Sequence, residues 1–165
     1  MQAGRKILAA LGVALVTATT LVATVAPASA VGSGGSNKLF MNINSGLCIE
    51  IAYGSTADFA RAVQSTCDSD PAQLWNYNVV IGEMRNVKSG KCLEIQYSSI
   101  ANFAPAGQYT CHGGQNQKWD FGYSGLIGNR HSKKCLEVAW SSKAEYAVIG
   151  QYDCHGQWNQ KWGYN

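Results

Sequence analysis

The chain has 165 residues, with 13 basic and 10 acidic side chains and a formal net charge of +3. This near balance lacks the positive electrostatic footprint of proteins that bind nucleic acid or an anionic membrane surface, so we expect neither partner. Loss of the leader described next removes two basic residues and no acidic one, which lowers the net charge to about +1.

Residues 1–30 have the pattern of a secretory signal peptide. Arg5 and Lys6 form a basic start, an apolar run follows, and Ala28-Ser29-Ala30 matches the small-x-small pattern that signal peptidase cuts. The apolar run is also long enough for an uncleaved membrane anchor. Its scattered threonines and the cleavage pattern favour removal, so we expect a secreted, extracellular protein whose mature form does not insert into a membrane.

After the leader, the chain divides into a short linker and one domain. Residues 31–37, VGSGGSN, are polar and rich in glycine and serine, which predicts a flexible lead-in. Residues 38–165 are enough for one hydrophobic core and too few for two ordinary domains. Six cysteines in an exported chain of this size predict three disulfides.

The cysteines mark a unit that occurs three times. Within each pair the separation is nineteen residues, and equivalent members recur after 44 and then 43 residues. The pairs are Cys48 and Cys67, Cys92 and Cys111, and Cys135 and Cys154. An asparagine and a serine before each first cysteine, a glutamate after it, and a Gln-x-Trp motif after each second cysteine keep the same register. The repeats therefore span approximately 38–80, 81–124 and 125–165.

Each repeat has the pattern of β structure. The segments CIEI, CLEI and CLEV, at 48–51, 92–95 and 135–138, place two aliphatic side chains on one strand face and the glutamate on the other. The connections carry Gly, Ser, Asn and Asp. No sustained helical periodicity appears after the leader, so the fold class is all-β with essentially no helix.

Three β units of about 43 residues suit either propeller blades or thirds of a closed barrel. Propellers usually carry four or more blades, so three copies favour a threefold barrel. In that fold, pairing the cysteines within each repeat is economical because each bridge closes a loop that a local hairpin already needs. We expect each bridge to contribute on the order of 3 kcal/mol.

These motifs resemble those of a known family. Three cysteine-bearing strands with an acidic residue, each followed by a second cysteine and a Gln-x-Trp close, resemble the ricin B-type lectin β-trefoil, also described as a family 13 carbohydrate-binding module. The resemblance covers residues 38–165 and implies a disulfide-stapled β-trefoil with a shallow sugar pocket on each repeat. A carboxylate accepts hydrogen bonds from vicinal hydroxyls, an amide donates and accepts, and an aromatic face packs against sugar C–H groups.

Carried over by position, the resemblance implies two competent sites. The implied carbohydrate-binding residues are Glu94, Tyr109, Asn116 and Gln117 in the second repeat, and Glu137, Tyr152, Asn159 and Gln160 in the third. The first repeat keeps Glu50, but Ser65 and Ala72 stand where the aromatic residue and the asparagine are expected. We therefore expect a degenerate first site.

The chain departs from the family pattern in two ways. All three acidic positions hold glutamate where the family commonly has aspartate, which moves the carboxylate outward and bears on which sugar binds. In addition, Phe59, Phe103 and Tyr146 occupy a mid-repeat loop position where the family commonly has glycine. These bulkier loops are expected to narrow or extend the pockets.

Several positions have a structural interpretation beside the binding one. The Gln-x-Trp tryptophans are predicted to be core, because Trp75 persists in the repeat that loses the ligand residues. Gln117 and Gln160 are ambiguous for the same reason, since Gln73 persists too. Exposed glutamates are mostly solvated, and a structural role for Glu94 and Glu137 also stays open.

Further candidates lie close to these positions. His112 and His155 follow cysteines assigned to disulfides, and a disulfide sulfur is a poor zinc ligand, so we expect a hydrogen bond to a sugar hydroxyl or an exposed loop position rather than a metal. Trp158 is unique to the third repeat and is a plausible extra wall beside Asn159. A ring of aromatic residues five positions after each first cysteine suits loop packing as well as stacking. Its members are Tyr53, Tyr97 and Trp140.

The sequence predicts a binding protein rather than an enzyme. A glycosidase needs two carboxylates across one bond, whereas the glutamates here are related by the repeat, and no common catalytic motif appears. We expect no cofactor, and a carbohydrate partner, either a polysaccharide or a glycan. The pattern assigns neither a sugar nor an oligomeric state. The alternative is a trefoil that binds a protein, as an inhibitor or toxin-like module, with vestigial sugar pockets.

Overall fold

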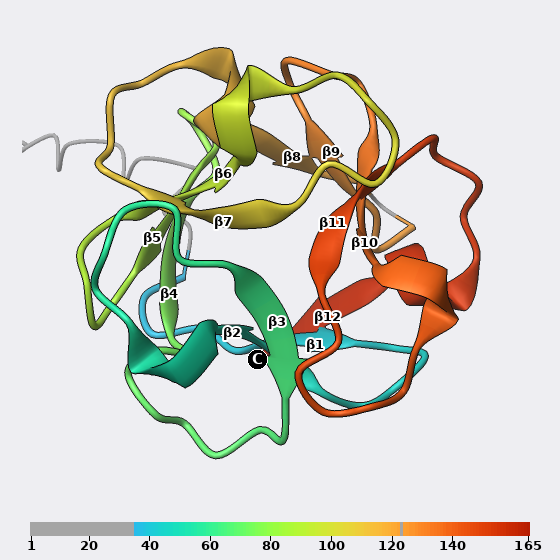
Figure 1. The fold of residues 1–165 in the computed structure, drawn as a ribbon, viewed down its shortest axis with the longest axis horizontal. Helices are drawn as coiled ribbons and strands as arrows, with labels where there is room; N and C mark the ends of the chain where they lie inside the picture. Colours follow the sequence, from blue (N-terminus) through green and yellow to red (C-terminus); the bar gives the residue numbers. More distant parts are fainter. Residues whose placement is uncertain (1–34, 123) are drawn as a thin grey trace, which may run out of the picture.

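The computed structural model describes residues 35–122 and 124–165, which form three four-stranded antiparallel sheets around a common centre (Figure 1). The strands are β1 (Phe40–Asn42), β2 (Cys48–Ile51), β3 (Ala62–Ser65), β4 (Trp75–Asn78), β5 (Glu83–Asn86), β6 (Cys92–Ile95), β7 (Ala106–Tyr109), β8 (Trp119–Phe121), β9 (Ile127–Asn129), β10 (Cys135–Val138), β11 (Ile149–Tyr152) and β12 (Trp162–Tyr164). The predicted signal peptide and the first residues of the lead-in lie outside the described part.

The described residues contain no α-helix, which confirms the all-β prediction. They contain short 3-10 helices, namely η1 (Ala52–Gly54), η2 (Gln96–Ser98), η3 (Gln115–Gln117), η4 (Ala139–Ser141) and η5 (Trp158–Gln160). Within the same residues, no helix has both the length and the apolar character needed to cross a bilayer.

Each sheet combines strands from two neighbouring repeats. The sheet orders are β4-β5-β6-β7, β8-β9-β10-β11 and β12-β1-β2-β3. The tryptophan-bearing strand that ends one repeat pairs with the strand that begins the next, as where Trp75 faces Asn86. The last strand does the same with the first, with Trp162 opposite Asn42. The barrel is therefore closed by pairing the two ends of the described chain.

The three innermost strands meet at the centre of the trefoil. Figure 1 shows β3, β7 and β11 around this centre, and single β-bridges join their surroundings across repeats, as between Pro105 and Gly150. A Cβ atom on Gly150 would lie 2.7 Å from the carbonyl oxygen of Ala104, so only glycine permits this close approach of two backbones.

The core is built from the predicted tryptophans and the aliphatic side chains of the cysteine-bearing strands. Trp75 and Trp119 are fully buried, and Trp162 is almost so. Each indole N–H donates to the backbone carbonyl of the residue that follows the first cysteine of its own repeat, as Trp119 does to Leu93 at 2.9 Å. The hydrogen bond satisfies the buried indole. The prediction that these tryptophans are structural is confirmed.

All three disulfides join the predicted partners within a repeat. They are Cys48–Cys67, Cys92–Cys111 and Cys135–Cys154, each with a sequence separation of 19. In each case the first cysteine begins a strand and the second lies just beyond the neighbouring antiparallel strand. The bridge therefore closes the open end of a hairpin.

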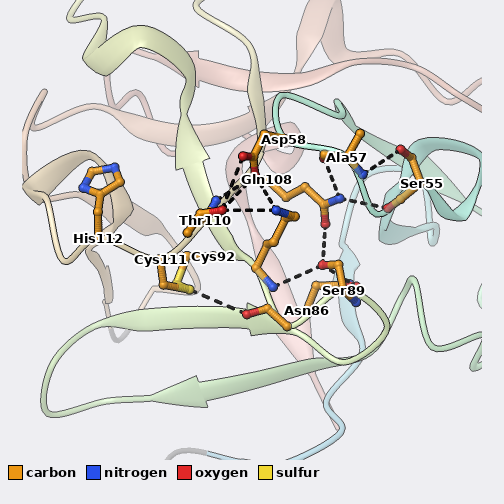
Figure 2. Close-up of polar contacts among 12 residues, drawn as sticks. Ser55, Ala57, Asp58, Asn86, Ser89, Cys92, Gln108, Thr110, Cys111 and His112 are labelled. Carbon is orange, nitrogen blue, oxygen red and sulfur yellow. Dashed lines mark hydrogen bonds and ion pairs between the residues drawn. A yellow bond between two sulfur atoms is a disulfide. The ribbon is translucent and has the colours of Figure 1, made fainter.

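A buried glutamine fastens each repeat to the one before it. The side-chain amide of Gln108, in β7, donates to the carbonyl oxygens of Ser55 and Ala57 at 2.8 and 3.0 Å, and its oxygen accepts from the hydroxyl of Ser89 at 2.7 Å (Figure 2). Its main-chain carbonyl also accepts from the N–H of Phe59 at 2.8 Å. We call this set of contacts the glutamine clasp.

The clasp is repeated in the other two repeats. Gln151 donates to Ser99 and Ala101, and its carbonyl accepts from Phe103. Gln64 makes the equivalent contacts with the last repeat and is, like the other two, fully buried. Because each clasp holds the mid-repeat loop of one repeat against a strand of the next, it sets where the loop aromatic residue lies.

Replacement of Gln108 by leucine is expected to destabilise the protein by about 1–3 kcal/mol, because the part-buried hydrogen bonds to the carbonyls of Ser55 and Ala57 and from the hydroxyl of Ser89 are lost. Urea unfolding of the oxidised protein, followed by tryptophan fluorescence, measures the change. Gln115→Leu, at an exposed site, is the matched control and should stay within about 0.5 kcal/mol of wild type. Equal unfolding midpoints for the two variants would contradict the clasp.

Candidate functional site

Two equivalent pockets lie in the second and third repeats, and each also uses a residue from the repeat before. The second-repeat pocket has a volume of about 170 Å³ and the third-repeat pocket about 230 Å³. The second is lined by Phe59, Glu94, Tyr97, Ser98, Tyr109, His112 and Asn116, and the third by Phe103, Glu137, Trp140, Ser141, Tyr152, His155 and Asn159. The two sets correspond position by position.

The carboxylate in each pocket is buried and oriented by neighbouring side chains. Glu94 is only 3% exposed, and its Oε2 accepts from the side-chain amides of Asn116 at 3.2 Å and Gln117 at 3.1 Å. His112 Nε2 lies 3.5 Å from the same oxygen. The other oxygen, Oε1, makes no hydrogen bond with any other described residue. The carboxylate is therefore held by one oxygen and keeps the other available to a ligand.

The third repeat reproduces this arrangement. Oε2 of Glu137 accepts from Asn159 at 3.2 Å and Gln160 at 3.1 Å, with His155 Nε2 at 3.4 Å. The alternative that these glutamates are simply solvated on an exposed strand face is excluded, and the structural role that the sequence left open is present. They are buried because a 3-10 turn of the same repeat folds over the strand and supplies amide donors, a contact that the alternation of the strand does not reveal.

Backbone contacts fix the proton position on each pocket histidine. The N–H of Gly114 donates to His112 Nδ1 at 3.1 Å, and that of Gln157 donates to His155 Nδ1 at 3.2 Å. A nitrogen that accepts a hydrogen bond carries no proton, so the neutral imidazole has its N–H at Nε2, on the side of the glutamate. The histidines thus lie against the carboxylate.

A continuous aromatic wall runs from the buried glutamate to the rim. In the second-repeat pocket, Phe59 stacks on Tyr97 with ring centroids 5.1 Å apart and 18° between the planes, and packs against Tyr109 at 4.7 Å. The ring of Tyr109 meets that of His112 at 6.0 Å. The loop aromatic that the sequence marked only as bulky is therefore the middle of the wall, contributed by the preceding repeat.

The same wall exists in the third repeat. Phe103 stacks on Trp140 at 4.6 Å and 17°, and packs against Tyr152 at 4.8 Å. Tyr152 in turn contacts His155 at 5.9 Å. Sequence reasoning ranked Trp140 and its equivalents as secondary and placed each site within one repeat. The repeat-junction geometry arises from the glutamine clasp. Its glutamines recur three positions before each second cysteine, which is a signal in the sequence, but their partners in the preceding repeat are set only by the fold.

The first-repeat pocket has different chemistry. Its volume is about 260 Å³, and its lining is Glu50, Tyr53, Gly54, Ser65, Asp68, Asp70, Lys88 and Tyr146. Glu50 accepts one side-chain amide hydrogen bond, from Gln73 at 3.0 Å, and is less buried than its counterparts. Ser65 interrupts the aromatic wall, and Asp68 stands where the other repeats have histidine.

The remaining predicted residues are placed away from the pocket lining. Gln117 and Gln160 are fully buried behind the carboxylates, where their oxygens accept from the backbone N–H of His112 and His155. They hold the glutamates as Gln73 holds Glu50. Trp158 is 62% exposed, lies outside the third-repeat lining, and has the ammonium of Lys161 at 4.7 Å from its ring centre.

A polar contact between repeats holds each loop aromatic beside its pocket. Asp58, directly before Phe59, accepts from the N–H of Thr110 at 2.9 Å and pairs with Lys91 (Figure 2 shows Asp58 and Thr110). The hydrogen bond from the Lys91 ammonium holds the pKa of Asp58 below its usual 3.8, and Thr110 adds to this effect.

The other two repeats keep this contact with different residues. The pKa of Asp153 is lowered by the side-chain hydrogen bond from Asn102 and by Lys134. Hydrogen bonds from Thr66 lower the pKa of Glu145. Within residues 35–122 and 124–165, no group of three or more His, Cys, Asp or Glu side chains is placed to hold a metal ion.

Comparison with family models assigns the chain to a class. The Ricin-type beta-trefoil lectin domain matches residues 80–165, and the Ricin-type beta-trefoil lectin domain-like model matches residues 24–109. The chain belongs to the ricin-type β-trefoil lectin family, as the cysteine and Gln-x-Trp repeats predicted. The fold of this family is one that binds carbohydrate, and the family is generally non-enzymatic.

Solved structures agree with this class. ThreeFoil, a designed threefold symmetric protein, is 30% identical with a TM-score of 0.72 over 77% of this chain and 96% of its own. The exo-β-1,3-galactanase 1,3Gal43A from Clostridium thermocellum is 32% identical with a TM-score of 0.73 over 78% of this chain, which spans 30% of the galactanase. The C-half of an earthworm R-type lectin, solved with GalNAc, shares the fold at 15% identity and a TM-score of 0.68 over 79% of this chain and 98% of its own. A search of curated proteins gives no match.

Acidification is expected to weaken the loop contact of Asp58. Because its folded-state pKa is depressed, the stabilisation is fully present above the unfolded pKa and is lost as pH falls through the folded value, below 3.8. Thermal unfolding at pH 6 and near pH 2.5 measures this loss. Asp58→Asn keeps an acceptor for Thr110 but does not titrate, so its melting temperature should fall less than that of wild type over the same range. An equal fall would show that Asp58 contributes nothing to the acid dependence.

Proposed function

We propose that this protein is a secreted lectin that binds a polysaccharide or glycan through the second-repeat and third-repeat pockets. The observation that carries the proposal is the buried glutamate, held at one oxygen by amide donors and open to the pocket at the other. This arrangement of a buried glutamate beside a complete aromatic wall occurs in the second and third repeats. The first repeat lacks the wall tyrosine and the asparagine donor.

The chemistry of the pockets suits a sugar ring. The free oxygen of Glu94 or Glu137 accepts from ring hydroxyls, and the faces of Tyr109 or Tyr152 pack against C–H groups. Both pocket volumes are below the roughly 300–1,000 Å³ of sites for drug-sized molecules, so each suits a single ring. Shallow sites of this size bind weakly one at a time, and useful affinity arises when two sites engage one polysaccharide or surface.

The pocket lining supports binding without catalysis. The second-repeat and third-repeat pockets each contain one carboxylate, Glu94 or Glu137, whereas glycoside hydrolysis requires two on either side of the scissile bond. Three disulfides and the signal-peptide pattern of residues 1–30 support export. The intact hydrogen bonding of both glutamates favours working sites over vestigial ones.

The double substitution Tyr109→Ser with Tyr152→Ser tests the proposal. It gives both pockets the serine that the first repeat already tolerates, and removal of the wall should lower glycan affinity at least about tenfold, equivalent to about 1.4 kcal/mol. A glycan and polysaccharide array followed by titration calorimetry measures the loss, with near-UV circular dichroism to verify the fold.

Glu50→Gln, in the first repeat, is the matched control and should bind like wild type. Absence of any glycan signal from the wild-type protein would overturn the lectin assignment in favour of a protein-binding trefoil. Unchanged glycan binding by the double variant would place the site elsewhere on the molecule.

A further inference from the structure

Six aromatic residues adopt a backbone conformation that such residues rarely take. Tyr53, Tyr97 and Trp140 have φ near 57–58°, and Phe59, Phe103 and Tyr146 have φ of 61–64°. Bulky side chains are genuine outliers in this left-handed region, where backbone strain is concentrated at functional sites. The six form three stacked pairs, one at each repeat junction.

Burial does not account for the outer member of each pair. Tyr97 is 78% exposed and Trp140 80% exposed. One ring face rests on Phe59 or Phe103, and the opposite face lies in solvent at the rim of the pocket. A strained residue that holds a flat ring open to water gains little for folding. Tyr97 and Trp140 differ from Tyr53 in that each lies beside a pocket with a complete aromatic wall, and this combination points to a ligand.

The outer rings are also pre-oriented. The stacked partner fixes the plane of the ring, and the glutamine clasp fixes that partner through its backbone N–H. At the second-repeat junction, Gln96 Nε2 adds a hydrogen bond to the carbonyl of Phe59 at 2.9 Å. A ring held in place before binding loses little conformational entropy when a ligand packs on it.

We propose that Tyr97 and Trp140 are platforms for a second sugar ring, so that each pocket recognises a chain of linked pyranosides rather than an isolated monosaccharide. The inference rests on the proposed lectin function and specifies its ligand class. One ring fills the pocket above the glutamate, and the next ring along the chain places its C–H face on the exposed aromatic face. The continuous wall joins the two positions.

The third-repeat pocket should be the stronger of the two. Trp140 offers a larger ring face than Tyr97, and the third-repeat pocket has the larger volume of the two, about 230 Å³ against 170 Å³.

The test compares ligands of increasing length. β-1,3-linked galactose, β-1,4-linked glucose and β-1,4-linked xylose are titrated by calorimetry as the monosaccharide, disaccharide and trisaccharide. For a sugar that binds, the wild-type affinity should rise at least about tenfold from the monosaccharide to the disaccharide. In the double variant Tyr97→Ser with Trp140→Ser, the ratio of disaccharide affinity to monosaccharide affinity should fall to about one. Equal affinities for both lengths in wild type, or a ratio that persists in the variant, would overturn the platform.

A gain-of-function variant keeps the proposal testable if the serine variant binds too weakly to measure. The Tyr152→Ser substitution leaves only the second-repeat pocket with a complete wall. In this background, Tyr97→Trp should raise the ratio of disaccharide to monosaccharide affinity, because tryptophan offers the second sugar ring a larger face. A ratio that stays the same or falls would contradict the proposal.

Tyr53→Ser is the matched control, because Tyr53 has the same strain and stacking but no complete pocket beside it, and it should keep the wild-type ratio. If no sugar of any length binds to wild type, the lectin function itself fails. If monosaccharides bind without a gain in length, only the platform is wrong.

Discussion

The glutamine clasp is the contact on which the rest of the molecule depends. A single buried amide, such as that of Gln108, satisfies two carbonyls of the preceding loop while its own backbone carbonyl accepts from the loop aromatic. Movement of the loop would break these hydrogen bonds and leave the fully buried amide of Gln108 without partners, which is costly, so the loop has little freedom to settle elsewhere. The clasp therefore ties the three repeats together and, through the same hydrogen bonds, sets Phe59 beside the pocket of the next repeat. The hydrogen bonds that join the repeats are therefore also the ones that build the site.

The buried glutamate follows from a second use of the same principle. A carboxylate removed from water needs donors, and the turn after the second cysteine supplies them from Asn116 and Gln117, with the imidazole Nε2 of His112 3.5 Å away. All three converge on one oxygen. The protein thus stabilises the charge and leaves the second carboxylate oxygen without a hydrogen bond to any described residue, in a side chain that lines the aromatic pocket. One carboxylate oxygen therefore serves the framework, and the other is left for a ligand.

The first repeat separates the parts that the fold requires from those that build the pocket. It retains the core tryptophan, the disulfide, the clasp and Gln73. It also has the stacked pair of Tyr53 and Tyr146, but without a complete pocket beside it. It lacks the wall tyrosine, the asparagine and the histidine, and its pocket is lined by charged side chains instead. The trefoil forms without those residues, so their retention in the other two repeats reflects the pocket rather than the barrel.

The sequence by itself determined the repeat, the disulfide pairing, the all-β class and the core tryptophans, because each depends on local spacing that recurs in register. It also singled out Glu94, Tyr109, His112 and Asn116, which the structure brings to one pocket. Only the tertiary structure decided that the glutamates are buried, that Gln117 lies behind the carboxylate, that Trp158 stands apart, and that Phe59 crosses from the preceding repeat. Those outcomes depend on contacts between segments far apart in the chain, and strand alternation records only which face a side chain takes, not what folds over that face.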